Sequence, residues 1–319
     1  MKKHIWFICF SAALIAFSTY IALDTFVIPR VYNSNATEMN TSLFTNIGKT
    51  PVSGNDSSIQ SQTQAEQSAS ASNESPTSGS ASGADYQDGN ISITMSEYYE
   101  NNTKIHVADV RLSSAEYLKT AFANDSYGKN ITETTSSMAQ SNNAILAVNG
   151  DYYGVQESGY VIRNGVVYRD TAKGCDVLCI YANGTMEIVG DGEYTADELV
   201  SKGVWQAFTF GPSLVVNSSI TVGVNDEVGK AMASNPRTAI GMIDTNHFVF
   251  VVSDGRTSES SGLSLYQLAQ FMQKLGVKTA YNLDGGGSST MYFNGQVINN
   301  PTSGRSIKER GVSDIVYIG

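Results

Sequence analysis

The stretch that most constrains this chain is residues 282–290, which read NLDGGGSST. Three consecutive glycines are costly in backbone entropy, so a folded domain keeps them where the chain adopts positive φ or approaches another group closely. An apolar run at residues 277–283 precedes them, and a second run at residues 290–293 follows. The sequence therefore predicts a turn between two buried strands, carrying a carboxylate, backbone amides and two hydroxyls.

Two interpretations of this turn stay open. It is either a binding loop for a polar or anionic ligand, or a glycine-rich bulge between strands that has no ligand. A nucleotide P-loop is disfavoured, because that motif requires a lysine after its last glycine and a helix behind it. Here Ser288 stands in place of the lysine and a predicted strand follows.

An apolar segment near the N-terminus predicts contact with a lipid membrane. Lys2 and Lys3 precede an uncharged stretch, residues 5–23, which is long enough to cross a hydrocarbon core as one helix. The positive-inside rule then puts the N-terminus in the cytoplasm and the rest of the chain outside. A cleaved signal peptide is the competing interpretation, but residues 20–22 match a small-x-small site poorly. We expect residues 1–32 to be an uncleaved signal anchor.

The composition changes between residues 33 and 88. Residues 53–84 are almost entirely Ser, Gln, Ala, Thr, Asn and Gly. Such a segment cannot bury enough apolar surface to offset the entropy of ordering it. We therefore predict a disordered tether that holds a globular domain, residues 89–319, off the membrane.

The net charge and the few cysteines and histidines argue against several classes of function. The formal net charge is −10, whereas nucleic-acid binding requires a basic face, so no nucleic-acid partner is expected. Cys175 and Cys179 fall in a predicted strand, about 13 Å apart, which is too far for a disulfide, whereas a helical turn at this place would allow one. The only histidines are His4, His106 and His247, so neither a nucleophilic triad nor a His-rich metal site is expected.

The domain is predicted to be strand-rich α/β, of mixed α+β type. Hairpin dipeptides Asn-Gly follow residues 163, 182 and 293. Helices are expected at residues 113–122, 132–142, after the capping-box pair Thr195 and Glu198, and at 263–275. Strands are expected at 104–111, 144–148, 160–163, 166–168, 178–181, 186–189, 207–210, 213–216, 238–243, 248–252, 277–282, 290–293, 296–298 and 314–318.

Five polar clusters lie at the ends of predicted strands, where sites in sheet proteins are often built. They are residues 149–154 (NGDYYG), 235–238 (NPRT), 253–256 (SDGR), 282–289 (NLDGGGSS) and 308–311 (KERG). Each alone is also typical of an ordinary turn. Together they supply three carboxylates and three arginines, which suit glycosyl or phosphoryl chemistry: Asp151, Asp254, Asp284, Arg237, Arg256 and Arg310. An oxygen-ligand site for Ca²⁺ or Mg²⁺ on the aspartates stays open.

In this order, the clusters resemble the phosphodiester glycosidase domain, found in the lysosomal uncovering enzyme and in bacterial proteins described as exopolysaccharide-biosynthesis proteins. The resemblance runs from about residue 89 to the C-terminus. It is carried by NGDYY at 149–153, FGPSL at 210–214, NPRTAIG at 235–241, DGR at 254–256, NLDGGGSST at 282–290 and ERGV at 309–312.

The resemblance implies hydrolysis of the bond between an anomeric carbon and a phosphodiester oxygen. It suggests Asp284 as nucleophile or base, and arginines that hold the phosphate. Asp151 or Asp254 would be the second carboxylate or would orient the sugar hydroxyls. The implied catalytic residues are Asp284, Asp151, Asp254 and Arg237. The implied substrate-binding residues are Asn149, Tyr152, Tyr153, Arg256, Asn282, Gly285, Gly286, Gly287, Ser288, Ser289 and Arg310.

The setting differs from that of the lysosomal relative. An anchor, a tether and few cysteines indicate a bacterial cell surface, where a sugar-1-phosphate linkage in a wall polymer, capsule or exopolysaccharide is the expected substrate. Two alternatives stay open: a non-catalytic glycan-binding or assembly factor, and a metal-dependent phosphodiesterase that breaks P–O instead of C–O.

Overall fold

Antiparallel pairing organises the domain into three main sheets. The computed structural model describes residues 2–32, 44, 85–226 and 234–319. The largest sheet has the order β14 (Ser219–Ile220), β13 (Ser213–Val216), β17 (Thr279–Asn282), β15 (Arg237–Asp244), β16 (His247–Ser253), β4 (Thr103–Leu112), β3 (Ile91–Glu100), β2 (Asp85–Gln87).

Two five-stranded sheets complete the core. The first has the order β19 (Gln296–Val297), β18 (Met291–Phe293), β7 (Leu146–Asn149), β22 (Asp314–Ile318), β5 (Leu118–Phe122). The second has the order β11 (Met186–Val189), β10 (Val177–Tyr181), β12 (Val204–Phe208), β8 (Val161–Arg163), β9 (Val166–Arg169). One buried apolar cluster takes side chains from all three sheets, for example Phe250, Val316 and Phe208. The strand-rich class predicted from the sequence is confirmed.

Three short helices cover the outer faces of the sheets. α4 (Leu265–Lys274) packs on the large sheet, α2 (Thr135–Ser141) on the sheet of β7 and β22, and α3 (Ala196–Ser201) on the third sheet. Capping boxes begin α3, from Thr195 and Glu198, and α4, from Ser264 and Gln267. These three predicted helices are confirmed.

The helix predicted at residues 113–122 is wrong. Only a 3₁₀ turn, η2 (Ala115–Tyr117), forms there, and β5 follows it. β5 pairs with the C-terminal strand β22, and Leu118 and Thr120 are buried against the core. This pairing partner lies almost 200 residues away along the chain, so the local pattern could not reveal it. Strand β3 was also missed, although it pairs with β4 along its whole length.

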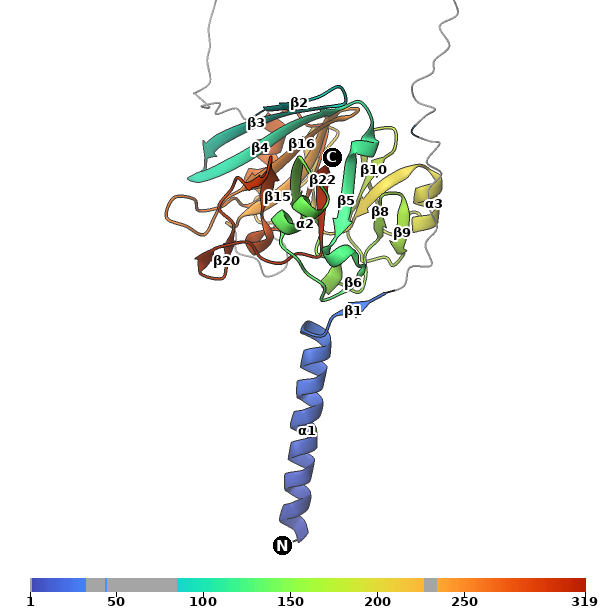
Figure 1. Ribbon diagram of the computed structural model, residues 1–319, viewed down its shortest axis with the longest axis vertical. Coiled ribbons are helices and arrows are strands. Elements are labelled where there is room, and N and C mark those ends of the chain that lie inside the picture. The colour runs from blue at the N-terminus through green and yellow to red at the C-terminus, as the bar shows by residue number, and fades with distance from the viewer. Residues whose placement is uncertain (1, 33–43, 45–84, 227–233) are drawn as a thin grey trace, which may run out of the picture.

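The N-terminal helix lies outside the sheets. α1 (Lys2–Phe26) is, over Trp6–Phe26, long and apolar enough to cross a membrane, with a mean hydropathy of 1.9. It runs away from one end of the domain (Figure 1). Directly after it, β1 (Arg30–Val31) pairs with β6 (Gly128–Lys129) of the domain. The predicted tether, residues 33–88, lies outside the described residues apart from Phe44 and residues 85–88.

All three cysteines lie in the described part of the chain and are free. The prediction that Cys175 and Cys179 do not pair is therefore confirmed. Cys179 lies in β10, whereas Cys175 precedes that strand.

Candidate active site

Four of the five polar clusters meet at one edge of the large sheet. In the antiparallel register, Arg237 at the start of β15 faces Ser253 at the end of β16, and Ala239 faces Asn282 at the end of β17. The cluster after β7 reaches the same edge, because Asp284 N donates to Gly150 O at 3.2 Å. Together they line a cavity of about 320 Å³ with Tyr152, Gln156, Phe210, Asn235, Arg237, Arg256, Asn282, Asp284, Gly285 and Gly286.

The fifth cluster reaches this cavity through Asp284. Arg310 Nη2 lies 2.9 Å from Asp284 Oδ2, and Ser288 Oγ donates to the same oxygen at 2.5 Å. The Asp284 side chain is 13% exposed. Burial raises its pKa, and Arg310 and Ser288 offset that rise only in part. The structure therefore presents one carboxylate to the cavity, held in place and made more basic than an ordinary aspartate.

Asn149 holds the glycine loop from behind. It is fully buried, and its Nδ2 donates to Asp284 O at 2.6 Å. Its Oδ1 accepts from Thr238 Oγ1 at 2.8 Å and from Thr290 N at 3.3 Å. Asn149 thus joins β7, β15 and both ends of the loop, and it does not line the cavity.

The glycines of this loop let neighbouring groups pack close to its backbone. They leave few N–H groups free to bind a ligand. Gly286 has a φ of +62°, and a Cβ there would lie 2.7 Å from Arg256 Nη2. Its N–H donates to Pro236 O at 2.8 Å, while Ser288 N and Ser289 N donate back within the loop. The amide of the central glycine is therefore engaged by the protein itself. Glycine is favoured at residue 286 by its positive φ, and it leaves room beside the Arg256 guanidinium.

Two arginines form the cationic wall. Arg237 is 3% exposed, and its Nε donates to Leu263 O at 2.9 Å. Arg256 has a φ of +60° and donates from Nη2 to Asn235 Oδ1 at 2.8 Å. Both guanidinium groups are thus oriented by the protein before a ligand arrives, which reduces the entropy lost on binding an anion.

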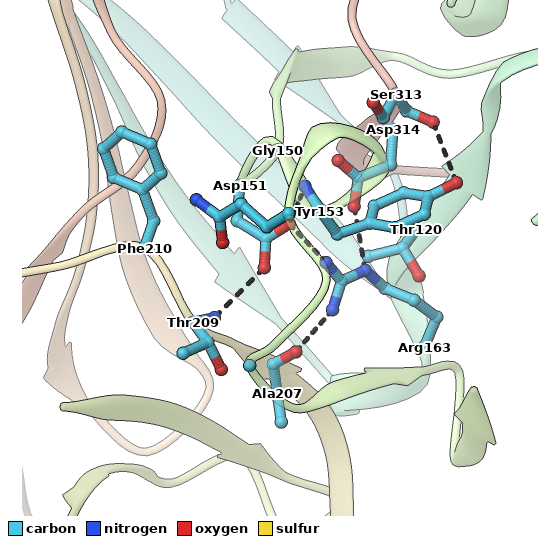
Figure 2. Close-up of polar contacts among 12 residues, drawn as sticks. Thr120, Gly150, Asp151, Tyr153, Arg163, Ala207, Thr209, Phe210, Ser313 and Asp314 are labelled. Atoms are coloured by element: carbon cyan, nitrogen blue, oxygen red, sulfur yellow. Dashed lines mark hydrogen bonds and ion pairs between the residues drawn. The ribbon is translucent and has the colours of Figure 1, made fainter. Parts of the chain in front are cut away.

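Behind the aromatic wall lies a buried charge cluster, which Figure 2 shows. Arg163 lies between two carboxylates, 2.9 Å from Asp151 Oδ1 and 2.8 Å from Asp314 Oδ2, and all three side chains are at most 2% exposed. Asp151 also accepts from Tyr153 N at 3.2 Å and from Thr209 N at 3.0 Å. These two backbone bonds fix the residues next to Tyr152 and Phe210, the two aromatic residues of the cavity.

Ionisation in this cluster follows from its burial. Burial, together with the charge of Asp151, raises the pKa of Asp314 to about 7 even though Arg163 opposes the rise. Burial would lower the pKa of Arg163, but the two carboxylates outweigh it and the net direction is upward. Burial also raises the pKa of the Tyr153 hydroxyl. Asp151 and Tyr153 were both predicted as site residues. Neither lines the cavity, and both lie behind its wall.

Asp254 is a third buried carboxylate outside the cavity, after Asp151 and Asp314. It is 2% exposed and accepts from Asn300 N at 2.8 Å and Asn299 Nδ2 at 3.3 Å, with His106 Nε2 at 3.7 Å. Burial acts to raise its pKa, but His106 and these amide donors outweigh that effect and hold the pKa below its ordinary value. Its position fixes the loop that presents Arg256, two residues later.

A cation site on the three predicted aspartates would need them close together. Each instead has its own partners: Arg163 for Asp151, His106 for Asp254 and Arg310 for Asp284. Within residues 2–32, 44, 85–226 and 234–319, no group of three or more His, Cys, Asp or Glu side chains is arranged to hold a metal.

Sequence reasoning missed some of the residues that complete the site. Gln156, Phe210 and Asn235 line the cavity but were not among the predicted site residues. Arg163 was also missed. Its only sequence signal is an arginine at the end of a short apolar strand, which is equally typical of a strand end in solvent.

Comparison with known proteins decides the family. The phosphodiester glycosidase family profile matches residues 142–319, which is more than half of the chain and includes every cavity-lining residue. The chain belongs to the phosphodiester glycosidase family.

Individual relatives are more distant. An uncharacterised SPbeta prophage-derived protein, YomE, of Bacillus subtilis is 33% identical over 60% of this chain and 30% of its own length. Human N-acetylglucosamine-1-phosphodiester alpha-N-acetylglucosaminidase is 42% identical over 21% of this chain and 13% of its own. The chain thus spans less than a third of either curated relative.

Solved structures support the fold. The catalytic domain of the zebrafish N-acetylglucosamine-1-phosphodiester alpha-N-acetylglucosaminidase, auto-inhibited by its pro-peptide, matches with a TM-score of 0.57 and 21% identity, over 72% of this chain and 82% of that one. A hypothetical protein from Synechocystis matches with a TM-score of 0.55 and 14% identity, over 72% and 62% of the two chains. At these identities the likeness concerns the fold.

Replacing Arg163 tests whether the charge cluster is structurally required. Arg163→Met leaves two buried carboxylates without their cation, so we expect the free energy of unfolding of residues 85–319 to fall by about 3–5 kcal/mol. Arg111→Met is the matched control, since the Arg111 side chain is 65% exposed. Urea denaturation compares the two, and equal stabilities would contradict the assignment.

The raised pKa of Asp314 predicts a pH dependence of stability. Because its pKa rises from 3.8 to about 7 on folding, the folded protein holds a proton that the unfolded chain releases in that window. This stabilising contribution is complete below about pH 4 and is lost as the pH rises through about 7. We expect the free energy of unfolding to fall across this window more steeply in the wild type than in Asp314→Asn. Urea denaturation at a series of pH values measures the free energy of unfolding of both proteins. The prediction is wrong if the two free energies change with pH in parallel.

Proposed function

We propose that this protein hydrolyses the anomeric C–O bond of a sugar-1-phosphodiester, releasing free sugar and a phosphomonoester. The observation that carries the proposal is the composition of one cavity. It combines the carboxylate of Asp284 with the guanidinium groups of Arg237 and Arg256 and the aromatic rings of Tyr152 and Phe210. A carboxylate suits an electrophilic anomeric carbon, arginines suit a phosphodiester, and aromatic rings suit a sugar face.

The leaving group explains why one cavity carboxylate suffices. A phosphate leaves with a low pKa, so it needs little help from a general acid, unlike the alcohol of an ordinary glycoside. We assign Arg237 and Arg256 to the phosphate and Asp284 to the anomeric carbon, as base toward water or as nucleophile. Arg310 and Ser288 orient Asp284. Asp151 and Asp254, buried behind the cavity, are positioning residues in this scheme.

Asn282 supplies a contact for the sugar. It is 1% exposed and lines the cavity, and its Nδ2 donates to Gly211 O at 2.8 Å, which sets the orientation of the amide. Its Oδ1 has no hydrogen-bond partner among the described residues. A buried acceptor in that state favours a ligand with an N–H or O–H at this position. Both the acetamido group of N-acetylglucosamine and a sugar hydroxyl meet this requirement, and the name of the human relative favours the former.

The cellular setting is part of the proposal. We assign residues 1–32 to a membrane anchor, residues 33–84 to a linker and residues 85–319 to the catalytic domain. The boundary predicted at residue 89 moves back to Asp85, because β2 pairs with β3 in the large sheet. The domain would act outside the cell on a sugar-phosphate linkage of a glycan at the cell surface.

Asp284→Asn tests the chemistry. The substitution keeps the size of the side chain but removes its basicity, so we expect kcat/KM on a GlcNAc-1-phosphodiester to fall by about 10³-fold or more. Asp244→Asn is the control, since Asp244 is 69% exposed and pairs with Lys278. Nuclear magnetic resonance of the products identifies the bond that breaks. Sugar-1-phosphate as product, lost on chelation, would support P–O cleavage instead, and saturable binding without turnover would support a glycan-binding role.

Arg310→Met tests the ionisation of Asp284. A carboxylate that acts as base or nucleophile must be ionised, so kcat/KM should rise with pH through the pKa of Asp284. Arg310 holds that pKa down against burial, so its removal should move the acidic limb of the kcat/KM profile to higher pH. If the acidic limb of the kcat/KM profile stays at the same pH in Arg310→Met, a group other than Asp284 controls it.

A further inference from the structure

The end of α1 is bound to the catalytic domain by specific contacts. Asn130 Nδ2 donates to Thr25 O and Ile28 O, each at 3.2 Å, at the last turn of the helix and just beyond it. β1 then pairs with β6 through Arg30 and Val31, and Tyr32 N donates to Tyr127 O at 2.9 Å. Gly128 permits this contact, because a Cβ there would lie 2.0 Å from Arg30 O.

The same segment of the domain supports the cavity wall. Asn130 N donates to Gly154 O at 3.1 Å, and Gly154 lies between Tyr152 and Gln156, both of which line the cavity. Tyr127 stacks on Tyr153 with ring centroids 5.2 Å apart. Two hydrogen bonds, both made by Asn130, and two residues of chain connect the end of α1 to the cavity rim.

A second wall of the cavity lies at the same end of the domain. β20 (Thr302–Ser303) contacts the 3₁₀ turn η5 (Gly286–Ser288), which carries Gly286 of the cavity. In Figure 1, β20 and β6 both lie at the end of the domain from which α1 runs.

The surface beside this end is suited to a bilayer interface. Exposed apolar and aromatic side chains lie at the end of the spanning segment and just beyond it, with exposed fractions between 39% and 71%: Phe26, Val27, Ile28, Val31 and Tyr32. Arg30, which pairs with Asp24, lies among them. Aromatic and aliphatic groups at the end of a spanning helix lie at the level of the lipid headgroups. The contacts of Asn130 and β6 therefore hold the cavity rim within reach of that level.

We propose that the substrate is a membrane-embedded glycolipid in which a single phosphodiester links the anomeric carbon of the sugar to the lipid. This inference rests on the proposed function and on α1 spanning the membrane. In such a lipid the scissile bond lies at the headgroup level, next to the position that the docked segment gives the cavity. A substrate in a distant polymer would require the opposite arrangement, with the cavity free to move away from the bilayer.

The reaction on this substrate balances with water alone. The C–O bond between the anomeric carbon and the phosphate oxygen breaks, and the water oxygen forms the new bond to that carbon. The bonding electrons stay with the phosphate oxygen, and the released proton passes to solvent or to the phosphate. The sugar leaves as a free hemiacetal, and the lipid keeps a phosphomonoester in the bilayer.

The test compares two substrates in one preparation. The full chain is reconstituted in phosphatidylcholine–phosphatidylglycerol vesicles and assayed on GlcNAc-1-phosphoryl-hexadecanol embedded in them, and on water-soluble GlcNAc-1-phosphoryl-methanol. Gly128→Ala blocks the pairing of β1. Asn130→Gly removes the two contacts to α1 while tolerating the φ of +57° at that position. Gly89→Ala is the control, because no atom lies within 4 Å of the added Cβ.

We expect both Gly128→Ala and Asn130→Gly to lower kcat/KM on the embedded lipid by 5-fold or more, with activity on the soluble ester within 2-fold of the wild type. The soluble ester also reports whether each variant is folded. Equal activity of wild type and variants on the embedded lipid overturns the docking proposal, as does turnover of the soluble ester without turnover of the lipid. Turnover of neither substrate by the wild type overturns the proposed function, and the inference with it.

Discussion

The ion-pair cluster of Arg163 with Asp151 and Asp314 is the interaction on which the site depends. It joins the loop after β7 and the end of β8, which are near each other in the chain, to the start of β22, which lies 151 residues beyond Arg163. Removing charges from water is costly, and the cost is offset here only by short contacts to two carboxylates and by backbone bonds. The same carboxylate of Asp151 holds the backbone beside both aromatic cavity residues. A charge cluster outside the cavity therefore sets the shape of its wall.

Close backbone approach is the second constraint. A Cβ on Gly150 would lie 2.1 Å from Asp314 Oδ1, and one on Gly286 would lie 2.7 Å from Arg256 Nη2. These glycines let charged side chains pack directly against the main chain. The consequence for function is that Asp284, Arg237 and Arg256 converge on one cavity of about 320 Å³. Their alignment exists before any ligand binds, as the proposed electrostatic stabilisation of a leaving phosphate would require.

Sequence reasoning succeeded where the signal is local. The helices that begin at Thr195 and Ser264 have capping residues and apolar spacing that act within one or two turns, so their positions could be predicted. It failed at residues 113–122, where β5 is stabilised by β22, a partner far away in the chain. It also missed β3, which lies between β4 and the edge strand β2 in the large sheet. Helical spacing at 113–122 did not prevent strand formation, because pairing with β22 buries Leu118.

The amino-acid sequence alone was enough to predict the family and to name the candidate site residues of the glycine loop, the three arginines and Asp284, as well as an N-terminal segment apolar enough to span a membrane. Which of the aspartates lines the cavity became clear only from the folded structure. Asp151, Asp254 and Asp284 all follow strands and carry the same carboxylate, so their motifs look alike in the chain. Their burial and partners differ because Arg163 and His106 come from other strands, and such contacts arise only when the sheets assemble.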